Sequence, residues 1–214
     1  MLGTVRLVTA LLTLAVLPNA PASAQTAQAG LELTPTDAWK PIVERDGVRS
    51  YRLDVEGSAH DAYRADANLC ASQDELLALF NEPEGFQNWL PRTESVELVE
   101  QSAFSQTVYV VSDAPWPLRS RDLTYALSIE LIDDGAWVSI TGLPDERPPQ
   151  RGKVRIASAN GDWVLRFLED QVHVSFMLHI EAGKVPAILA RRTLHYAVRN
   201  TLVNLMKTHP CDDV

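Results

Sequence analysis

The chain has 214 residues, with 19 Lys and Arg against 28 Asp and Glu, and a formal net charge of −9 at pH 7. An acidic balance of this size argues against nucleic acid as a partner, because phosphate binding needs a basic surface. The length suffices for one domain with a substantial core, and no internal repeat or Gly/Ser linker divides the sequence. We therefore expect a single domain.

The N-terminus has the pattern of a secretory signal peptide. Arg6 precedes an apolar run over 7–17, and the small-residue triplet Ala22-Ser23-Ala24 follows. This run is much shorter than the about 20 residues of a spanning helix, so a retained anchor is the weaker alternative. We expect cleavage near Ala24 and export, most simply to the periplasm of a Gram-negative-type bacterium. The domain division is then a signal peptide at 1–24, a flexible leader at 25–37 and one folded domain at 38–210.

Two strands and two short helices are predicted first. Alternating apolar and polar residues favour strands over 48–55 and 62–70. Ser72 is a suitable N-cap for a helix that runs to Phe80, and a second helical piece covers 83–90.

A long run of strands and one helix make up the rest of the chain. Strands are predicted over 95–100, 107–111, 123–132, 137–142, 153–158, 163–169 and 172–181. Turns are expected at 133–135, 160–162 and 169–171, which makes successive strands antiparallel. The final helix is predicted over 185–208, with Pro186 in its first turn and an apolar stripe that must be buried. This order predicts an α+β fold of the helix-grip type, in which a curved antiparallel sheet wraps around the long C-terminal helix, with two short helices after an early strand.

Residues that face this helix either fill a core or line a pocket between sheet and helix. They share inward positions on the predicted strands or a place on the buried stripe of the helix. The candidates are Ala65, Ala67, Arg121, Leu123, Tyr125, Leu127, Ile129, Trp163, Val174, Phe176, Leu178, Ala190, Leu194 and Val198.

Two motifs indicate a family. The segment 114–122, Ala-Pro-Trp-Pro-Leu-Arg-Ser-Arg-Asp, resembles the Pro-aromatic-Pro-Leu…Arg-Asp signature of START domains, the lipid-binding branch of the helix-grip (SRPBCC) superfamily. Gly183-Lys184-Val185-Pro186 is similar to the start of the family's last helix, and the resemblance covers about 39–206. It implies a cavity that binds a lipid or another hydrophobic molecule, with lipid transport as the associated activity.

Three residues around the motif bear on the ligand. Arg121 has the inward position and is either a ligand contact or a paired structural arginine. Asp122 has the outward position, where we expect it to hold the strand start to a neighbouring backbone or to Arg119. Sterol-carrying START members tend to place an arginine six residues beyond the motif arginine. Leu127 stands there in this chain, which argues against a sterol.

Two other classes of function remain open. One is a helix-grip enzyme, such as a cyclase or hydrolase that acts on a hydrophobic substrate, and the other is a structural or partner-binding protein with a filled core. No catalytic constellation is visible, and the inward titratable candidates are only Arg121 and Tyr125. The histidines are scattered, with His173 and His179 expected on the solvated face, so we predict no metal and no cofactor.

Two pairs of residues have open interpretations. Arg192 and Arg199 lie on a helix face without acidic residues, which is either a solvated face or a surface for transient contact with an anionic membrane. Cys70 and Cys211 either form a disulfide or remain separate thiols. We expect a monomer.

Overall fold

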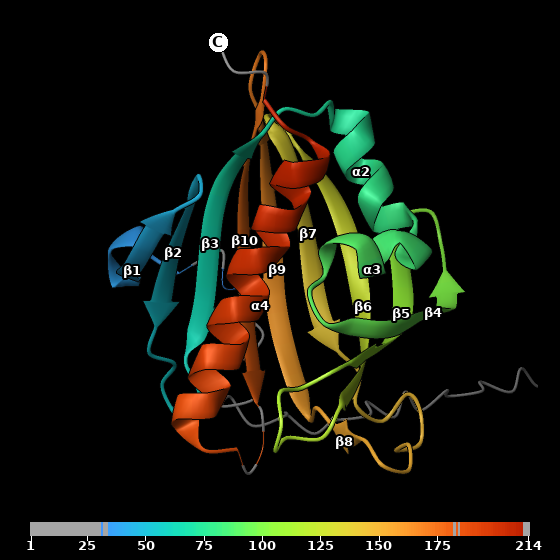
Figure 1. Cartoon of the computed structure of the whole chain (residues 1–214). Helices are drawn as coiled ribbons and strands as arrows, with labels where there is room; N and C mark the ends of the chain where they lie inside the picture. The colour runs from blue at the N-terminus through green and yellow to red at the C-terminus, as the bar shows by residue number, and fades with distance from the viewer. Residues whose placement is uncertain (1–30, 32–33, 182, 184, 212–214) are drawn as a thin grey trace, which may run out of the picture.

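Figure 1 shows the computed structural model, which describes Leu31, residues 34–181, Gly183 and residues 185–211. The expected signal peptide at 1–24, most of the leader at 25–37 and Lys184 of the second motif lie outside these residues. Within the described part, no helix is both long and apolar enough to cross a membrane.

The described residues form a ten-stranded sheet that curves around one long helix (Figure 1). The strand order is β1-β2-β3-β10-β9-β7-β6-β5-β4, with antiparallel neighbours throughout, and β8 pairs in parallel with β6. The strands are β1 (Lys40–Arg45), β2 (Val48–Leu53), β3 (Ala62–Leu69), β4 (Thr93–Gln101), β5 (Ser105–Ser112), β6 (Arg121–Ile132), β7 (Gly135–Gly142), β8 (Val154–Arg155), β9 (Ser158–Phe167) and β10 (Val172–Glu181).

The helices lie on the concave side of the sheet (Figure 1). A 3-10 turn, η2 (Thr36–Ala38), precedes β1, and α2 (Gln73–Asn81), η3 (Pro83–Gly85) and α3 (Phe86–Trp89) follow β3. Ser72 caps α2 in a capping box with Glu75, in which each side chain accepts a hydrogen bond from the backbone N–H of the other residue. The long helix α4 (Ala187–Thr208) crosses the sheet, with Pro186 as its N-cap rather than in its first turn.

The main core lies between α4, α2–α3 and the concave face of the sheet. At its centre, the rings of Trp163 and Phe176 stack with centroids 4.0 Å apart, and Trp89 meets Trp163 edge-on at 5.7 Å. Val198 and Leu202 of α4 are fully buried against this cluster. The helix-grip architecture expected from the sequence is confirmed.

Two local features differ from the prediction: one strand was missed and one predicted turn was wrong. The strand β1 was not predicted, because all six of its residues are exposed and no alternation marks it. Residues 160–162 form no turn but lie in the middle of β9. Gly161 is required there, since a Cβ at this position would lie 2.6 Å from the Met177 carbonyl oxygen on β10.

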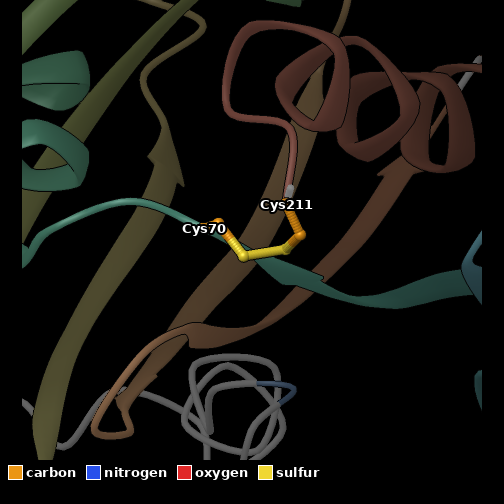
Figure 2. The surroundings of a disulfide bond; sticks show 2 residues. All are labelled: Cys70 and Cys211. Carbon is orange, nitrogen blue, oxygen red and sulfur yellow. A yellow bond between two sulfur atoms is a disulfide. The ribbon is translucent and has the colours of Figure 1, made fainter. Parts of the chain in front are cut away.

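A disulfide connects the end of β3 to the C-terminal end of α4. Cys70 directly follows β3, Cys211 lies just beyond α4, and their Cα atoms are 4.9 Å apart (Figure 2). This bond closes the chain between two residues that are 141 positions apart and ties the helix to the sheet at one end.

Candidate ligand-binding site

Two connected chambers lie between the sheet and α4. The inner chamber has a cavity volume of about 140 Å³ and the outer chamber about 160 Å³. Both are lined by the same six residues at their junction, which are Pro91, Ser112, Arg121, Ile156, Ile180 and Ala197. The two chambers therefore form one cavity, with an interior part and a part near the surface.

The inner chamber is apolar and partly aromatic. Its walls include Phe80, Trp89, Trp163 and Phe176 at the aromatic cluster of the core, and Leu127 of β6. Arg121 is the one charged residue among the described residues that line it. Such a wall suits an apolar group, because pockets for hydrophobic ligands combine apolar lining with few placed polar groups.

The outer chamber has charged residues at its rim, and they are paired. Arg92 contacts Asp113 at 3.4 Å, and its guanidinium lies 5.5 Å from the centroid of the Tyr196 ring on α4. Arg191 of α4 contacts Asp61 at 3.0 Å, just before β3. These contacts join α4 to the loops on two sides of the rim.

Arg121 differs from the other arginines of the cavity. It is the first residue of β6 and lines both chambers, as its inward position predicts. Its Nη1 donates to the Arg119 carbonyl oxygen, and no carboxylate of the described residues lies within salt-bridge distance. Burial, and secondly the charge of Arg119, lowers the pKa of the Arg121 guanidinium. The cavity thus contains a partly desolvated cation without a counter-ion among the described residues.

Asp122 has a different partner from the one expected. Its carboxylate oxygen Oδ2 accepts from Arg155 Nη2 at 2.8 Å, from Arg155 Nε at 3.1 Å and from the Tyr109 hydroxyl at 3.2 Å. Arg155 also donates to the carbonyl oxygens of the segment 144–148. The expected contact with Arg119 is therefore corrected: Asp122, which is 1% exposed, fixes β6 to the loop before β8.

Most of the predicted cavity residues line the two chambers. Arg121, Leu123, Tyr125, Leu127, Trp163, Phe176 and Leu178 line the inner chamber, and Ala190 and Leu194 line the outer one. Burial raises the pKa of the Tyr125 phenol above its ordinary value, so its hydroxyl stays protonated. Leu127, the residue six positions beyond Arg121, also lines the inner chamber.

Five predicted residues line neither chamber: four are corrected here to buried core positions, and Ile129 is half-buried and packs against the core. They are Ala65, Ala67, Ile129, Val174 and Val198. For Ala65 and Ala67 the reason is that α4 packs directly on β3, where small side chains bring the helix close to the sheet. Strand alternation shows which face of the sheet a residue lies on. It does not show where along the strand the helix stands far enough from the sheet to leave a cavity.

Several lining residues were not predicted. The inner chamber also contacts Phe80, Phe86, Trp89 and Leu90 of the α2–α3 segment, Val110 of β5, Ile140 of β7, Ile156 after β8, and Ala197 and Thr201 of α4. The apolar character of the 83–90 piece was visible in the sequence. Which part of the sheet it covers depends on tertiary packing, for which the sequence carries no local signal.

The two arginines proposed for membrane contact have different surroundings. Arg199 contacts Asp46 at 2.6 Å and donates to the Arg45 carbonyl oxygen at 2.9 Å, so it holds α4 to the β1–β2 turn. Its side chain is only 14% exposed, and it is corrected from a docking residue to a structural one. Arg192 is exposed. Near it on the helix, His195 Nε2 lies 3.0 Å from Ser50 Oγ of β2.

His179 is also not on a solvated surface as expected. Its Nε2 lies 3.0 Å from Ser58 Oγ, and its side chain is 12% exposed. Burial lowers the pKa of His179. Nearby, His60 Nδ1 lies 3.0 Å from Glu181 Oε2, and His60 lines the outer chamber. This cluster joins the β2–β3 connection to the end of β10. No group of three metal-ligating side chains occurs in the described part of the chain.

The fold and the cavity together define a helix-grip protein with an apolar chamber under its long helix. No family model matches the chain. An uncharacterized protein of Pseudomonas aeruginosa is 28% identical over 170 residues, which cover 78% of this chain and 84% of that protein.

Solved structures give the clearest relationship. The STAR-related lipid transfer protein (fragment 25-204) from Xanthomonas axonopodis is 31% identical, with a TM-score of 0.76 over 80% of this chain and 98% of that one. Human StAR-related lipid transfer protein 5 shares the fold, with a TM-score of 0.71 and 14% identity over 88% of this chain and 91% of that one. The chain belongs to the START (StAR-related lipid transfer) domain family.

Proposed function

We propose that this protein binds a lipid or another hydrophobic small molecule in the cavity between the sheet and α4 and transfers it between membranes. The observation that carries the proposal is the inner chamber, which connects to a second chamber near the surface. The described residues that line the inner chamber are apolar or uncharged except for Arg121. The lipid transfer proteins among its structural relatives support the same proposal.

Binding without turnover is the better-supported activity. The titratable side chains that line the inner chamber within the described residues are Arg121 and Tyr125. Burial raises the pKa of Tyr125, so its hydroxyl exchanges no proton near neutral pH. His60 lies at the outer chamber, where its Nδ1 contacts Glu181.

Filling the cavity tests the proposed function. Ala197 lines both chambers from α4, and we expect Ala197→Phe to reduce the affinity for a neutral hydrophobic fluorescent probe at least about tenfold, because the ring occupies the junction. The matched control is Ala126→Phe, whose side chain faces the other side of the sheet between Tyr125 and Leu127 on β6. Equal probe binding by both variants, with unfolding transitions close to that of the wild type, would contradict a ligand site in this cavity.

We further propose a transient membrane contact at the rim of the outer chamber. Trp116, which is 92% exposed, lies on the loop whose residues Ala114 and Leu118 line that chamber. Ile188, which is 68% exposed, lies in the first turn of α4 beside Ala187, which lines that chamber. Arg192 follows Ile188 by one helical turn, and both line a separate depression next to β1. Exposed Trp beside basic residues is typical of surfaces that meet lipid headgroups.

Trp116→Ser is expected to reduce the rate of transfer between anionic vesicles about tenfold, while affinity for the hydrophobic probe in solution stays unchanged. The expected size of this reduction follows from the loss of one large apolar side chain from the lipid contact, because burying such a side chain contributes about 1.5–3 kcal/mol. Phe104→Ser is the control, because Phe104 is 66% exposed at the other end of β5. Equal losses in both variants would show that Trp116 has no particular role at the membrane.

We also propose export after cleavage near Ala24, with the protein acting as a monomer in the periplasm. The Cys70–Cys211 disulfide supports this compartment, because structural disulfides persist in oxidising environments. The mass of the exported chain tests the cleavage site, since removal of 1–24 leaves a chain that begins at Gln25.

A further inference from the structure

We propose that the ligand is an anionic amphiphile with a single apolar chain or compact ring system, whose carboxylate or phosphate group binds Arg121 at the junction of the two chambers. This inference rests on the proposed function and names the class of ligand for the same cavity.

The first argument is the distribution of charge in the cavity. Arg92 and Arg191 at the rim each contact a carboxylate, Asp113 and Asp61. Arg121 has no such partner among the described residues, and its one hydrogen bond there is to the Arg119 carbonyl oxygen. The carboxylate beside it in the sequence, Asp122, is already bound to Arg155. No carboxylate in the described part of the chain therefore acts as a counter-ion for Arg121.

The second argument is the free energy of Arg121 as a partly desolvated cation. An arginine removed from water is stabilised when an anion and further hydrogen-bond acceptors satisfy its guanidinium, and it is costly without them. A guanidinium also has a planar fork of donors that matches the two oxygens of a carboxylate or phosphate. An anionic group on the ligand would satisfy Arg121 in a way that a hydroxyl or ester would not.

The third argument is the shape of the space beyond Arg121. From this residue inward, the chamber is bounded by Leu123, Leu127 and the rings of Trp163 and Phe176. The two chambers have cavity volumes of about 140 and 160 Å³. Taken together, they reach only the lower end of the range of typical ligand pockets, which is roughly 300–1,000 Å³. One apolar chain or compact ring system fits this space better than two acyl chains do.

The experiment compares ligands with the same chain and different head groups. Hexadecanoate, hexadecyl phosphate and hexadecan-1-ol compete with a neutral fluorescent probe for the purified chain at pH 8. We expect at least one of the two anions to bind at least about tenfold more tightly than the alcohol, which corresponds to a charge-assisted hydrogen bond. A preference for hexadecanoate identifies a carboxylate ligand, and a preference for the phosphate identifies a phosphate monoester.

Three variants assign this preference to Arg121. Arg121→Met is expected to lose the preference for the anion, measured as the ratio of anion to alcohol affinity within the same variant, and Arg121→Lys keeps part of the preference. Arg119→Met, which removes an exposed charge near the cavity, is expected to keep it.

Two results overturn the inference while leaving the proposed function in place. One is equal binding of anions and alcohol by the wild type, and the other is an unchanged preference in Arg121→Met. If the wild type binds none of the three compounds and no other hydrophobic probe, the proposed function itself fails. The wild-type comparison does not depend on whether the Arg121 variants fold.

Discussion

The Asp122→Ala variant is expected to lose about 3–5 kcal/mol of the free energy of unfolding, because it breaks a buried ion pair from one side. The Asp122 and Arg155 side chains are only 1% and 11% exposed. Without the carboxylate, the Arg155 guanidinium stays buried against backbone carbonyl oxygens with no anion to balance its charge. Chemical denaturation followed by tryptophan fluorescence measures the loss.

Two comparisons show whether the loss comes from the unpaired charge. The double variant Asp122→Leu, Arg155→Met removes both charges and is expected to be more stable than Asp122→Ala. Asp134→Ala breaks the exposed pair with Arg166 and is expected to change stability by at most about 1 kcal/mol. A change of that small size in Asp122→Ala would contradict the role of the pair.

The double variant Cys70→Ala, Cys211→Ala is expected to lose about 2–5 kcal/mol of stability and to unfold at a lower temperature by about 2–4 °C for each kcal/mol. The loss is large because the bond joins residues separated by 141 positions, so it removes much of the freedom of the unfolded chain. It also removes the covalent tie of α4 to the sheet seen in Figure 2.

Reduction provides the control for this prediction. The wild type treated with a thiol reductant is expected to unfold at nearly the temperature of the double variant, and the reductant is expected to leave the double variant unchanged. Unfolding of the wild type and the double variant at the same temperature under oxidising conditions would mean that the bond contributes nothing to stability.

The architecture was predictable because the chain carries strong local signals for it. Alternating residues gave β10 with its observed bounds, and Ser72 marked the start of α2. The apolar stripe of the last helix gave α4 to within two residues at its N-terminal end. The proline-rich motif and Gly183 linked this order of elements to the family.

The errors share one cause, which is that tertiary contacts outweigh local preference. Residues 160–162 have the composition of a turn, but β9 continues through them because β7 and β10 pair on either side of Gly161. The partner of Asp122 is 33 positions further along the chain, in a short strand. The contact of Arg199 with Asp46 depends likewise on how α4 crosses β2.

The sequence predicted which side chains of the strands face the candidate site, but it did not predict how far the cavity extends along the helix. The inward positions on β6 correctly brought Arg121, Leu123, Tyr125 and Leu127 to the cavity. The position of the empty space along the helix is set by where α4 approaches β3 and where the α2–α3 segment covers the sheet. Both depend on packing between distant segments, so the residues under the middle of the helix were assigned to the cavity although they belong to the core.

Native mass spectrometry of the wild-type protein, purified from its own cells without detergent, is the most direct test of a ligand-binding cavity. We expect a fraction of the protein to carry one bound hydrophobic molecule per chain, released on collisional activation. The same preparation of Ala197→Phe is expected to carry none. A wild-type protein that carries no molecule, and that takes up none when incubated with lipid vesicles, would contradict the account.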